Sequence, residues 1–366
     1  MIYKSFENDS LSLLGMGNMR LPTVGEGGAI DFTKAAEIID YGYNHGISYF
    51  DTAYVYHNGE SEKVVGEVLS KYPRESYRLA TKFFILANPD YKAVFEEQLQ
   101  KLKTDYIDFY LCHAIFDNTI DRYFDCGCID YFLEQKAKGR IKHLGFSIHA
   151  SLSTLKRFAS HHKWDFAQIQ VNYLDWTLQD AKSQYDLLTG MGIPVIVMEP
   201  LRGGRLASLT PEADALLKAE QPDWPIASWA FRWLMRLDNV KVILSGMSTL
   251  DQMKDNVNTF EKEELLNDKQ AEVLAKACDM FRSQYTVPCT ACRYCCDDCP
   301  KNIDIPKVLE IYNRYKVSGS RWELDMIKRM EVGPADCIAC DSCVSHCPQN
   351  IKIPDIMKEL TQIMAG

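Results

Sequence analysis

Short apolar runs recur along the first two thirds of the chain, separated by polar and helix-like segments. Each run is apolar enough for a strand buried on both faces. The runs are LSLLGMG (11–17), ISYFDTA (47–53), YRLATKF (77–83), IDFYLCHA (107–114), IKHLGFS (141–147), FAQIQVN (166–172), PVIVMEP (194–200) and VKVILSG (240–246). Intervening segments such as YKAVFEEQLQKL and IASWAFRWLMRL place apolar residues at i, i+3 and i+4, which is the helical period.

Eight such alternations over about 250 residues predict a (β/α)8 TIM barrel, with its active site at the carboxyl ends of the strands. A doubly wound open sheet is the alternative. It requires a glycine-rich dinucleotide motif after the first strand, and GMGNMR lacks the third glycine of G-x-G-x-x-G. We therefore expect a barrel domain over residues 1–283.

A repeated cysteine pattern follows the last apolar run. CTACRYCCDDCPKNIDIP begins at Cys289 and CIACDSCVSHCPQNIKIP begins at Cys337, and both fit C-x2-C-x2-C-x3-C-P-x-N-I-x-I-P. In this spacing three cysteines hold one [4Fe–4S] cluster and the fourth belongs to the other cluster. The first predicted set is Cys289, Cys292, Cys295 and Cys347, and the second is Cys337, Cys340, Cys343 and Cys299.

Cys296 has no counterpart in the second copy, so we expect it to bind no iron. Structural zinc is the alternative, but it prefers thiolates arranged as two separated pairs. Helix-like segments follow Pro306 and Pro354, the two prolines that end the repeat. The pattern resembles two-cluster ferredoxin domains, and we expect residues 284–366 to form a small, mainly helical domain of this type.

Four polar side chains follow three neighbouring strand runs. Asp51 and Tyr56 follow the second run, Lys82 ends the third and His113 ends the fourth. A lysine ammonium favours the ionised form of a nearby phenol, an aspartate holds the lysine, and an imidazole orients a carbonyl oxygen. Together they predict protonation of a carbonyl while hydride is delivered. Strand alternation and the D-x4-Y spacing favour Tyr56 over Tyr54 as the acid.

At these residues the chain resembles the aldo-keto reductase family, over roughly residues 10 to 260. The resemblance implies that Asp51, Tyr56, Lys82 and His113 are the catalytic tetrad, and that a nicotinamide cofactor lies across the barrel mouth. It also implies cofactor contacts at the carboxamide (Ser147, Gln170), on the nicotinamide face (Met198), in the loop over the pyrophosphate (Leu201, Arg202, Gly203, Gly204), near the adenine (Asp255, Asn256) and at Ser245, Gly246 and Gln252.

The choice between NADPH and NADH depends on two of these positions. Gly246 and Gln252 stand where many NADP-preferring relatives of the family carry lysine and arginine. We therefore expect NADH to bind comparably with NADPH, unless Arg202 or Arg205 supplies the missing charge.

Composition indicates the cellular compartment and argues against some classes of partner. The net charge of −9 makes nucleic acid an unlikely partner, and no apolar stretch is long enough to span a membrane. The N-terminus lacks the basic start and apolar run of a signal peptide, and most of the 13 cysteines form two tight clusters, which predicts a cytoplasmic protein. The cysteines outside those clusters are predicted to be small buried apolar residues: Cys112, Cys126, Cys128 and Cys278.

These patterns predict an NAD(P)H-dependent oxidoreductase that interconverts a small carbonyl compound and its alcohol, and whose clusters exchange electrons with a redox partner protein. Because a cluster passes single electrons and nicotinamide passes a hydride, coupling requires a carrier such as a flavin, expected between the two domains. Two alternatives stay open. The barrel can serve an electron-transfer protein by binding a cofactor or partner, or the clusters can be structural or redox-sensing and uncoupled from hydride chemistry.

Overall fold

The structure is a computed structural model, and it describes residues 1–25, 28–283, 287–318 and 321–365. It divides into two compact units. The barrel unit comprises Met1–Leu201 and Asp223–Ala271, and the cluster unit comprises Arg202–Pro222 and Glu272–Gly366. The predicted domain boundary after residue 283 falls at residues 284–286, outside the described residues. Within the described ranges, every helix is too short or too polar to cross a lipid bilayer.

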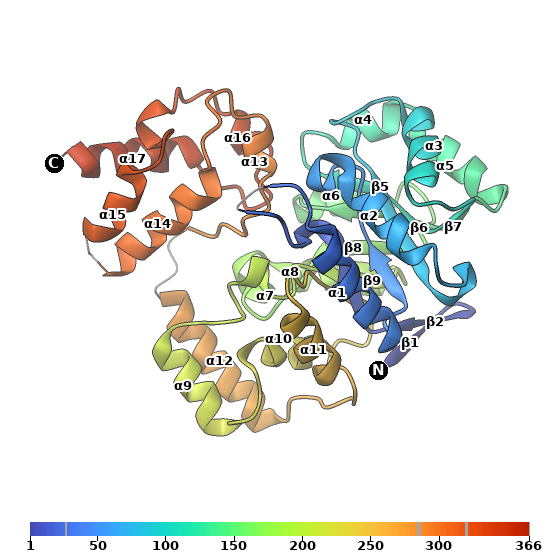
Figure 1. Ribbon diagram of the computed structural model, residues 1–366, viewed down its shortest axis with the longest axis horizontal. Coiled ribbons are helices and arrows are strands. Elements are labelled where there is room, and N and C mark those ends of the chain that lie inside the picture. Colours follow the sequence, from blue (N-terminus) through green and yellow to red (C-terminus); the bar gives the residue numbers. More distant parts are fainter. Residues whose placement is uncertain (26–27, 284–286, 319–320, 366) are drawn as a thin grey trace. The chain divides into compact units, whose positions relative to one another are not determined.

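Eight parallel strands form a closed barrel in the order β10-β3-β4-β5-β6-β7-β8-β9 (Figure 1). The strands are β3 (Leu14–Gly17), β4 (Tyr49–Asp51), β5 (Arg78–Phe83), β6 (Ile107–Ile115), β7 (Ile141–Ile148), β8 (Phe166–Gln170), β9 (Val195–Met198) and β10 (Val240–Ser245). Each predicted apolar run overlaps one of them, and β6 and β7 extend one residue beyond theirs. The predicted barrel is confirmed, and the doubly wound sheet is wrong.

Helices alternate with these strands along the sequence, as the apolar periodicity predicts. Side chains at the starts of several helices accept a hydrogen bond from the first turn, including those of Asp31, Asp90, Ser151 and Thr249. The helices of the barrel unit are α1 (Phe32–Asn44), α2 (Glu60–Leu69), α3 (Tyr91–Lys101), α4 (Ile120–Asp125), α5 (Cys128–Ala137), α6 (Leu152–Ala159), α7 (Asp175–Leu178), α8 (Ala181–Gly190), α10 (Ile226–Leu234) and α11 (Leu250–Thr259).

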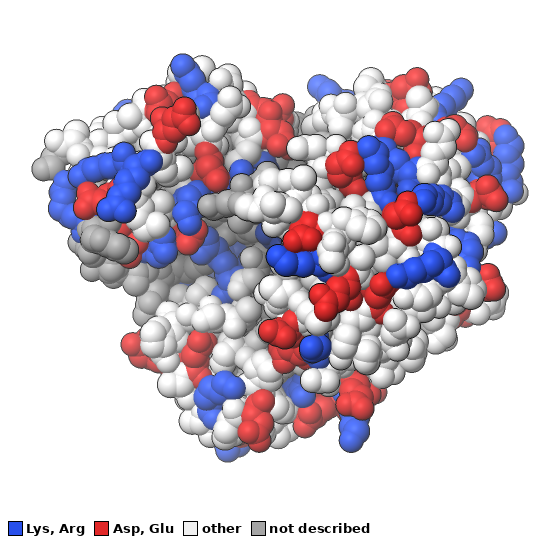
Figure 2. Space-filling model, in the orientation of Figure 1, with Lys and Arg blue, Asp and Glu red and all other residues white. Residues whose placement is uncertain are grey.

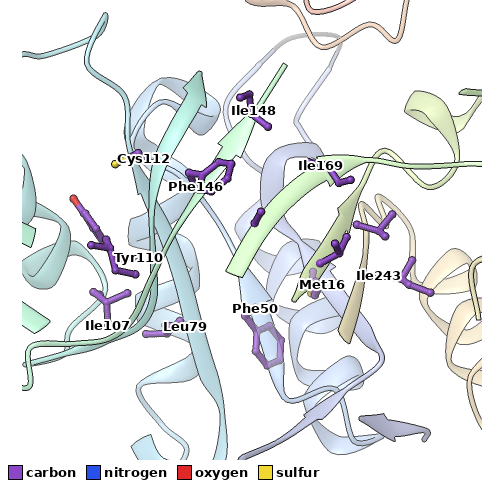
Figure 3. Close-up of a cluster of buried hydrophobic side chains, with 14 of the residues drawn as sticks. Met16, Phe50, Leu79, Ile107, Tyr110, Cys112, Phe146, Ile148, Ile169 and Ile243 are labelled. Carbon is purple, nitrogen blue, oxygen red and sulfur yellow. The ribbon is translucent and has the colours of Figure 1, made fainter. Parts of the chain in front are cut away.

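Alternate residues of each strand belong to two different apolar layers. Tyr49 and Phe109 belong to a cluster inside the barrel. Their neighbours Phe50 and Tyr110 belong to the layer between strands and helices, which Figure 3 shows. Successive strand side chains point to opposite faces, so both faces of each strand must be apolar. This double burial explains why the strand runs are apolar almost throughout.

An antiparallel hairpin of β1 (Tyr3–Phe6) and β2 (Asp9–Ser12) precedes the barrel. Its Phe6 belongs to the inner cluster, and the Phe6 ring lies 5.2 Å from the Phe109 ring in edge-to-face contact. The predicted single strand over 11–17 is therefore wrong in detail. Its first residues belong to β2, and the chain leaves the hairpin at Leu13 before β3 begins.

The cluster unit is mainly helical, as predicted, and follows the cysteine repeat. The short helices α13 (Tyr294–Asp297) and α16 (Ser342–Ser345) lie at equivalent places in the two copies, as do α14 (Ile305–Ser318) and α17 (Ile353–Ala365). Its other helices are α9 (Pro211–Glu220), α15 (Arg321–Lys328) and all but the first residues of α12 (Asp268–Ser283). A small apolar core joins α14, α15 and α17, with Val308, Leu309, Ile353 and Leu360 fully or almost fully buried.

Both charge signs occur over the surface. On the face drawn in Figure 2, basic and acidic side chains are interspersed, without a broad area of one sign. Many are paired along one helix, as are Lys182 and Asp186 in α8. Such exposed pairs contribute little to stability, in the range of about 0 to 1 kcal/mol each.

Candidate functional site

The barrel places three of the four predicted tetrad residues on inward positions of neighbouring strands. Asp51 follows the inward Tyr49 by two residues, and Lys82 and His113 follow Ala80 and Leu111 by two. Every second side chain of a strand points to the same face. All three side chains therefore point into the barrel, near its carboxyl end. All are buried, with exposed fractions of 2% or less. The sheet therefore brings together residues that lie far apart in the sequence.

Lys82 is the centre of this group. Its Nζ donates to Asp51 Oδ1 at 2.5 Å and to the Thr52 carbonyl oxygen at 2.6 Å, and it lies 5.0 Å from the centroid of the Tyr56 ring. Burial lowers the pKa of Lys82 and raises the pKa of Asp51, while the attraction between the two charges opposes both shifts. Removing either partner would leave a buried charge uncompensated.

Tyr56 is carried by a strained turn rather than by a strand. It begins the short 3-10 segment Tyr56–Gly59, in which His57 and Asn58 have φ of 51° and 55°. Its ring contacts the His113 ring edge to face, at 5.8 Å between centroids. Tyr54 has a different role, because its hydroxyl donates to Glu97 Oε2 of α3 at 3.0 Å. The structure thus places Tyr56, and not Tyr54, beside Lys82 and His113.

His113 is neutral at pH 7. Burial, together with the Lys82 charge, holds the pKa of His113 well below its usual value. A neutral imidazole has one N–H donor and one acceptor nitrogen. The Tyr123 hydroxyl donates to the backbone carbonyl oxygen of His113 at 2.6 Å and so fixes the end of β6.

A buried polar network supports the strand that carries Lys82, and the sequence analysis missed it. The Glu62 carboxylate accepts from Thr81 Oγ1 at 2.5 Å and from Gln98 Nε2 at 2.7 Å, and the same Nε2 donates to the Lys82 carbonyl oxygen at 3.1 Å. Glu62 and Gln98 are completely buried on α2 and α3. The sequence signal that could have revealed this network is a carboxylate and an amide at apolar-face positions of two neighbouring predicted helices.

The residues expected at the nicotinamide end lie on further inward positions. Ser147, Gln170 and Met198 are at the ends of β7, β8 and β9. The Ser147 hydroxyl accepts from the Ala114 N–H at 2.8 Å, and Gln170 Nε2 donates to Asp175 Oδ2 at 2.7 Å. The strand ends thus gather a hydroxyl, an amide and a thioether above the tetrad.

The residues expected at the adenosine end lie around β10 and α11. Asn256 Nδ2 donates to Ser245 Oγ at 2.9 Å, and Gln252 Oε1 accepts from the Ser248 N–H at 2.8 Å. Asp255 is half-buried on α11, and Leu201 packs against the barrel core.

Arg20 is a cation at this end that the sequence analysis overlooked. A Cβ added at Gly246 would meet the aliphatic part of the Arg20 side chain at 3.4 Å. Its guanidinium lies 3.8 Å from Glu199, and the Ser248 hydroxyl donates to its carbonyl oxygen. Nothing in the sequence near Gly246 points to a residue so distant along the chain.

Arg202 and Gly203 lie in a different unit from the other predicted cofactor contacts. They belong to the cluster unit, together with Gly204 and Arg205. Arg202 is completely buried, and its Nη2 donates to Gln349 Oε1 at 2.9 Å.

Two hollows in the cluster unit gather the remaining predicted site residues. One has about 290 Å³ of empty space and is lined by Cys289, Cys292, Cys295 and Cys347 among its walls. The other has about 360 Å³ and is lined by Cys299, Cys337, Cys340 and Cys343. Each hollow thus takes three cysteines from one copy of the repeat and the fourth from the other. Cys296 lines neither of these two hollows, whereas Ile353 lines both.

The walls of these hollows fit iron–sulfur clusters. Ala291 and Arg293 have φ of 54° and 68°, and their counterparts Ala339 and Asp341 have φ of 53° and 60°, so the backbone bends in the left-handed region at equivalent points. One such bend directs the Ala291 N–H to Cys289 Sγ at 3.4 Å. Burial raises the pKa of Cys289 and raises that of Cys343 to about 11. Bound iron offsets this penalty because its positive charge stabilises thiolates.

The remaining cysteines lie in the barrel unit or on α12. Cys112 and Cys128 are buried, and Cys126 and Cys278 are half-buried. Interactions with neighbouring thiols, together with burial, raise the pKa of Cys126 and Cys128 far above the usual range. Thiols of this kind are poor nucleophiles, because the thiolate is the reactive form.

Comparison with known proteins finds a family for each of the two parts of the chain. Residues 13–278 match the model of the aldo/keto reductase family, and residues 288–351 match that of the 4Fe-4S dicluster domain. Two curated relatives are a probable aldo-keto reductase 1 of Glycine max and the NADH-specific methylglyoxal reductase of Escherichia coli (strain K12). The first is 29% identical over 205 residues, 53% of this chain and 57% of that protein. The second is 24% identical over 324 residues, 73% and 97% of the two chains.

Solved structures give the same result for the barrel. The holo form of an aldo-keto reductase from Bacillus halodurans aligns with a TM-score of 0.63 and 29% identity, over 76% of this chain and 96% of that one. The chain therefore belongs to the aldo/keto reductase family and is an oxidoreductase of that family with a C-terminal 4Fe-4S dicluster domain.

Proposed function

We propose that the barrel reduces a small carbonyl compound, or oxidises the corresponding alcohol, with NADPH or NADH. The observation that carries this proposal is the buried Lys82 ammonium, 2.5 Å from Asp51 and 5.0 Å from the centre of the Tyr56 ring. A cation at this distance favours negative charge on the phenol oxygen, which is what a proton donor to a carbonyl must accommodate.

Each member of the tetrad has a separate task in this mechanism. A bound nicotinamide supplies hydride to the carbonyl carbon. Tyr56 gives its hydroxyl proton to the carbonyl oxygen, so the product is a neutral alcohol. Lys82 stabilises the resulting phenolate, and Asp51 keeps the lysine charged and in place. His113, being neutral, donates a hydrogen bond that orients the carbonyl oxygen.

The residues at the strand ends suit a nicotinamide. Ser147 and Gln170 supply a hydroxyl and an amide, the groups that bind a carboxamide, and Met198 offers a polarisable apolar side chain. The relative from Escherichia coli is named as NADH-specific and as a methylglyoxal reductase, which supports a small carbonyl substrate. Its cofactor preference is not transferred, because the residues around Gly246 decide it in this chain.

Isotope transfer tests this proposal directly. The protein is incubated with a panel of small aldehydes and ketones and with NADPH or NADH that carries deuterium at the transferable position. Deuterium on the carbinol carbon of the product is expected. Absence of turnover with both nucleotides, or an alcohol without the label, would contradict the proposal.

We propose further that the two cysteine sets hold one [4Fe–4S] cluster each and that these exchange single electrons with a partner protein. The observation behind this is the difference in exposure between the two sets. In the first set Cys289, Cys295 and Cys347 are buried and Cys292 is half-buried, whereas in the second set Cys343 is buried, Cys299 and Cys337 are half-buried and Cys340 is exposed. Electrons can therefore reach the second hollow from outside. A flavin as the carrier between clusters and nicotinamide stays a prediction, since no relative named above is described with one.

Anaerobic stopped-flow separates this proposal from uncoupled clusters. NADH or NADPH is added to the oxidised protein, and the broad visible absorbance of the clusters is followed with and without added flavin. Bleaching supports coupled clusters. If absorbance never changes and carbonyl turnover is the same with oxidised and reduced clusters, the clusters are structural or redox-sensing.

A further inference from the structure

The segment Arg202–Gly204 follows the last residue of β9 by four positions, yet it belongs to the cluster unit. Arg202 has a φ of 48°, and Gly203 and Gly204 have φ of 67° and 94°. A left-handed conformation is unfavourable for a residue such as arginine, and burial of its guanidinium adds a further cost. A conformation of this kind persists where the surroundings fix it.

What fixes this loop is the wall of the first hollow. Arg202 Nη2 donates to Gln349 Oε1 at 2.9 Å, and Gln349 lines the hollow of Cys289, Cys292, Cys295 and Cys347. Arg205 Nε donates to the backbone carbonyl oxygen of Cys289 itself at 2.9 Å. One guanidinium therefore contacts the backbone of a cysteine of this hollow, and the other contacts a glutamine of its wall.

The charges around the two hollows differ as a result. Arg293, which is paired with Asp304 at 3.2 Å, lines the first hollow, in addition to the two arginines that contact its wall. Lys301 and Asp341 line the second, and their charges have opposite signs. Guanidinium groups keep their positive charge at all accessible pH values.

These charges matter because reduction adds one electron to a group that thiolates already make negative. Cluster potentials depend on net charge, hydrogen bonds and solvent exposure. Burial of the first hollow by itself opposes reduction, and nearby positive charges favour it. The guanidinium groups lie within hydrogen-bonding distance of the wall, where little water screens them.

We propose that Arg202 and Arg205 tune the cluster of the Cys289 set, giving it the higher reduction potential of the two, so that the first electron taken up resides there. This rests on the proposed function, since it requires both clusters. It also assigns the two arginines to the cluster, and not to the cofactor pyrophosphate or to a 2′-phosphate.

The test is a redox titration of the full chain, purified anaerobically and followed by electron paramagnetic resonance. In Arg205→Gln, the equilibrium constant for one of the two reduction steps should fall about tenfold, which is 59 mV for one electron. Arg314→Gln is the matched control, because this half-exposed arginine of the same unit pairs with Glu310 and Glu323 and does not line either hollow. It should shift neither step.

Further variants identify the cluster. In a Cys340→Ser background, which leaves the Cys289 set complete, Arg205→Gln should still shift the remaining step. Arg202→Lys keeps the charge and should shift the potential less than Arg205→Gln, which guards against a variant that fails to fold.

Nucleotide titration completes the test. Binding of NADPH to Arg205→Gln should stay within about twofold of the wild type. Unchanged potentials together with a tenfold loss of NADPH affinity would overturn the inference, as would equal shifts of both reduction steps. Wild-type protein that contains no iron and sulfide would instead refute the proposed function.

Discussion

The tetrad of the barrel and the cysteine hollows are both buried, but different forces hold their reacting groups. Asp51, Lys82 and His113 are on paired strands between two apolar layers, and this arrangement requires no bound group. The cysteines line hollows whose backbone bends repeatedly in the left-handed region around a small core. One site is preorganised by the fold, whereas the other needs its ligand to offset the cost of its own geometry.

Removal of iron should separate the two regions most clearly. Structural metal binding is worth on the order of 10 kcal/mol in small metal-dependent domains, so chelation should unfold the helices around the hollows. Hydrogen exchange should show the amides of α14 and α17 losing at least about a hundredfold of protection, while β5 and β6 keep theirs. Equal loss of protection in β5 and β6 would mean that the barrel depends on the clusters as well.

Tyr56→Phe should have the largest effect within the barrel. Loss of a positioned proton donor lowers kcat by about 10² to 10⁴-fold, with little change in nucleotide affinity, because only the hydroxyl is removed. Steady-state kinetics and nucleotide titration measure the two effects. Tyr54→Phe is the matched control and should keep most of its kcat, since its hydroxyl donates to Glu97 instead.

Cys347→Ser should halve the iron content of the protein. The cluster that is lost should be the one that the first copy of the repeat holds with three cysteines. The reason is that Cys347 lines the hollow of Cys289, Cys292 and Cys295. Iron analysis and electron paramagnetic resonance of the remaining cluster measure this. Cys296→Ser is the control and should keep both clusters. Retention of the Cys289 cluster in Cys347→Ser would refute the crossed arrangement.

The stability of the barrel should depend on pH through His149. Burial lowers the pKa of His149 to about 4, so the unfolded chain binds a proton first as the pH falls. Stability is therefore present above the ordinary histidine pKa and is lost as the pH falls toward 4, by about 2 kcal/mol between pH 7 and pH 5. Urea unfolding of the barrel at both pH values measures this loss. His149→Phe, which preserves a ring against Phe116, should lack this part of the pH dependence.

Arg20→Gln should have the smallest effect, on nucleotide choice. If Arg20 provides the charge that Gly246 and Gln252 lack, its loss should weaken NADPH binding by about 1 kcal/mol, because the side chain is partly exposed and its charge is screened. NADH binding should not change. Fluorescence titration with both nucleotides measures the difference, and equal weakening of both would show that Arg20 does not contact a 2′-phosphate.

The sequence predicts the barrel well because its strands are buried on both faces and therefore stand out as apolar runs. It misplaces the hairpin, because β2 and β3 are separated by one residue and read as a single run. The repeat spacing predicts which cysteines line a common hollow, since three neighbours cannot surround a cubane. The contacts of Arg202 and Arg20 could not be predicted from the sequence. They join segments far apart along the chain, and no periodicity of the sequence indicates such contacts.

The segment Arg202–Pro222 has a consequence for synthesis on the ribosome. It emerges before residues 272–366, with which it shares a compact unit, whereas β10 pairs with β3 and β9, which are both made before it. Domains generally fold as units during synthesis, with the N-terminal part first. The barrel strands can therefore close while this segment still lacks its partners, and cluster insertion becomes the last assembly step. A cell short of iron would accumulate chains with a finished barrel and an undocked loop, a natural target for proteolytic quality control.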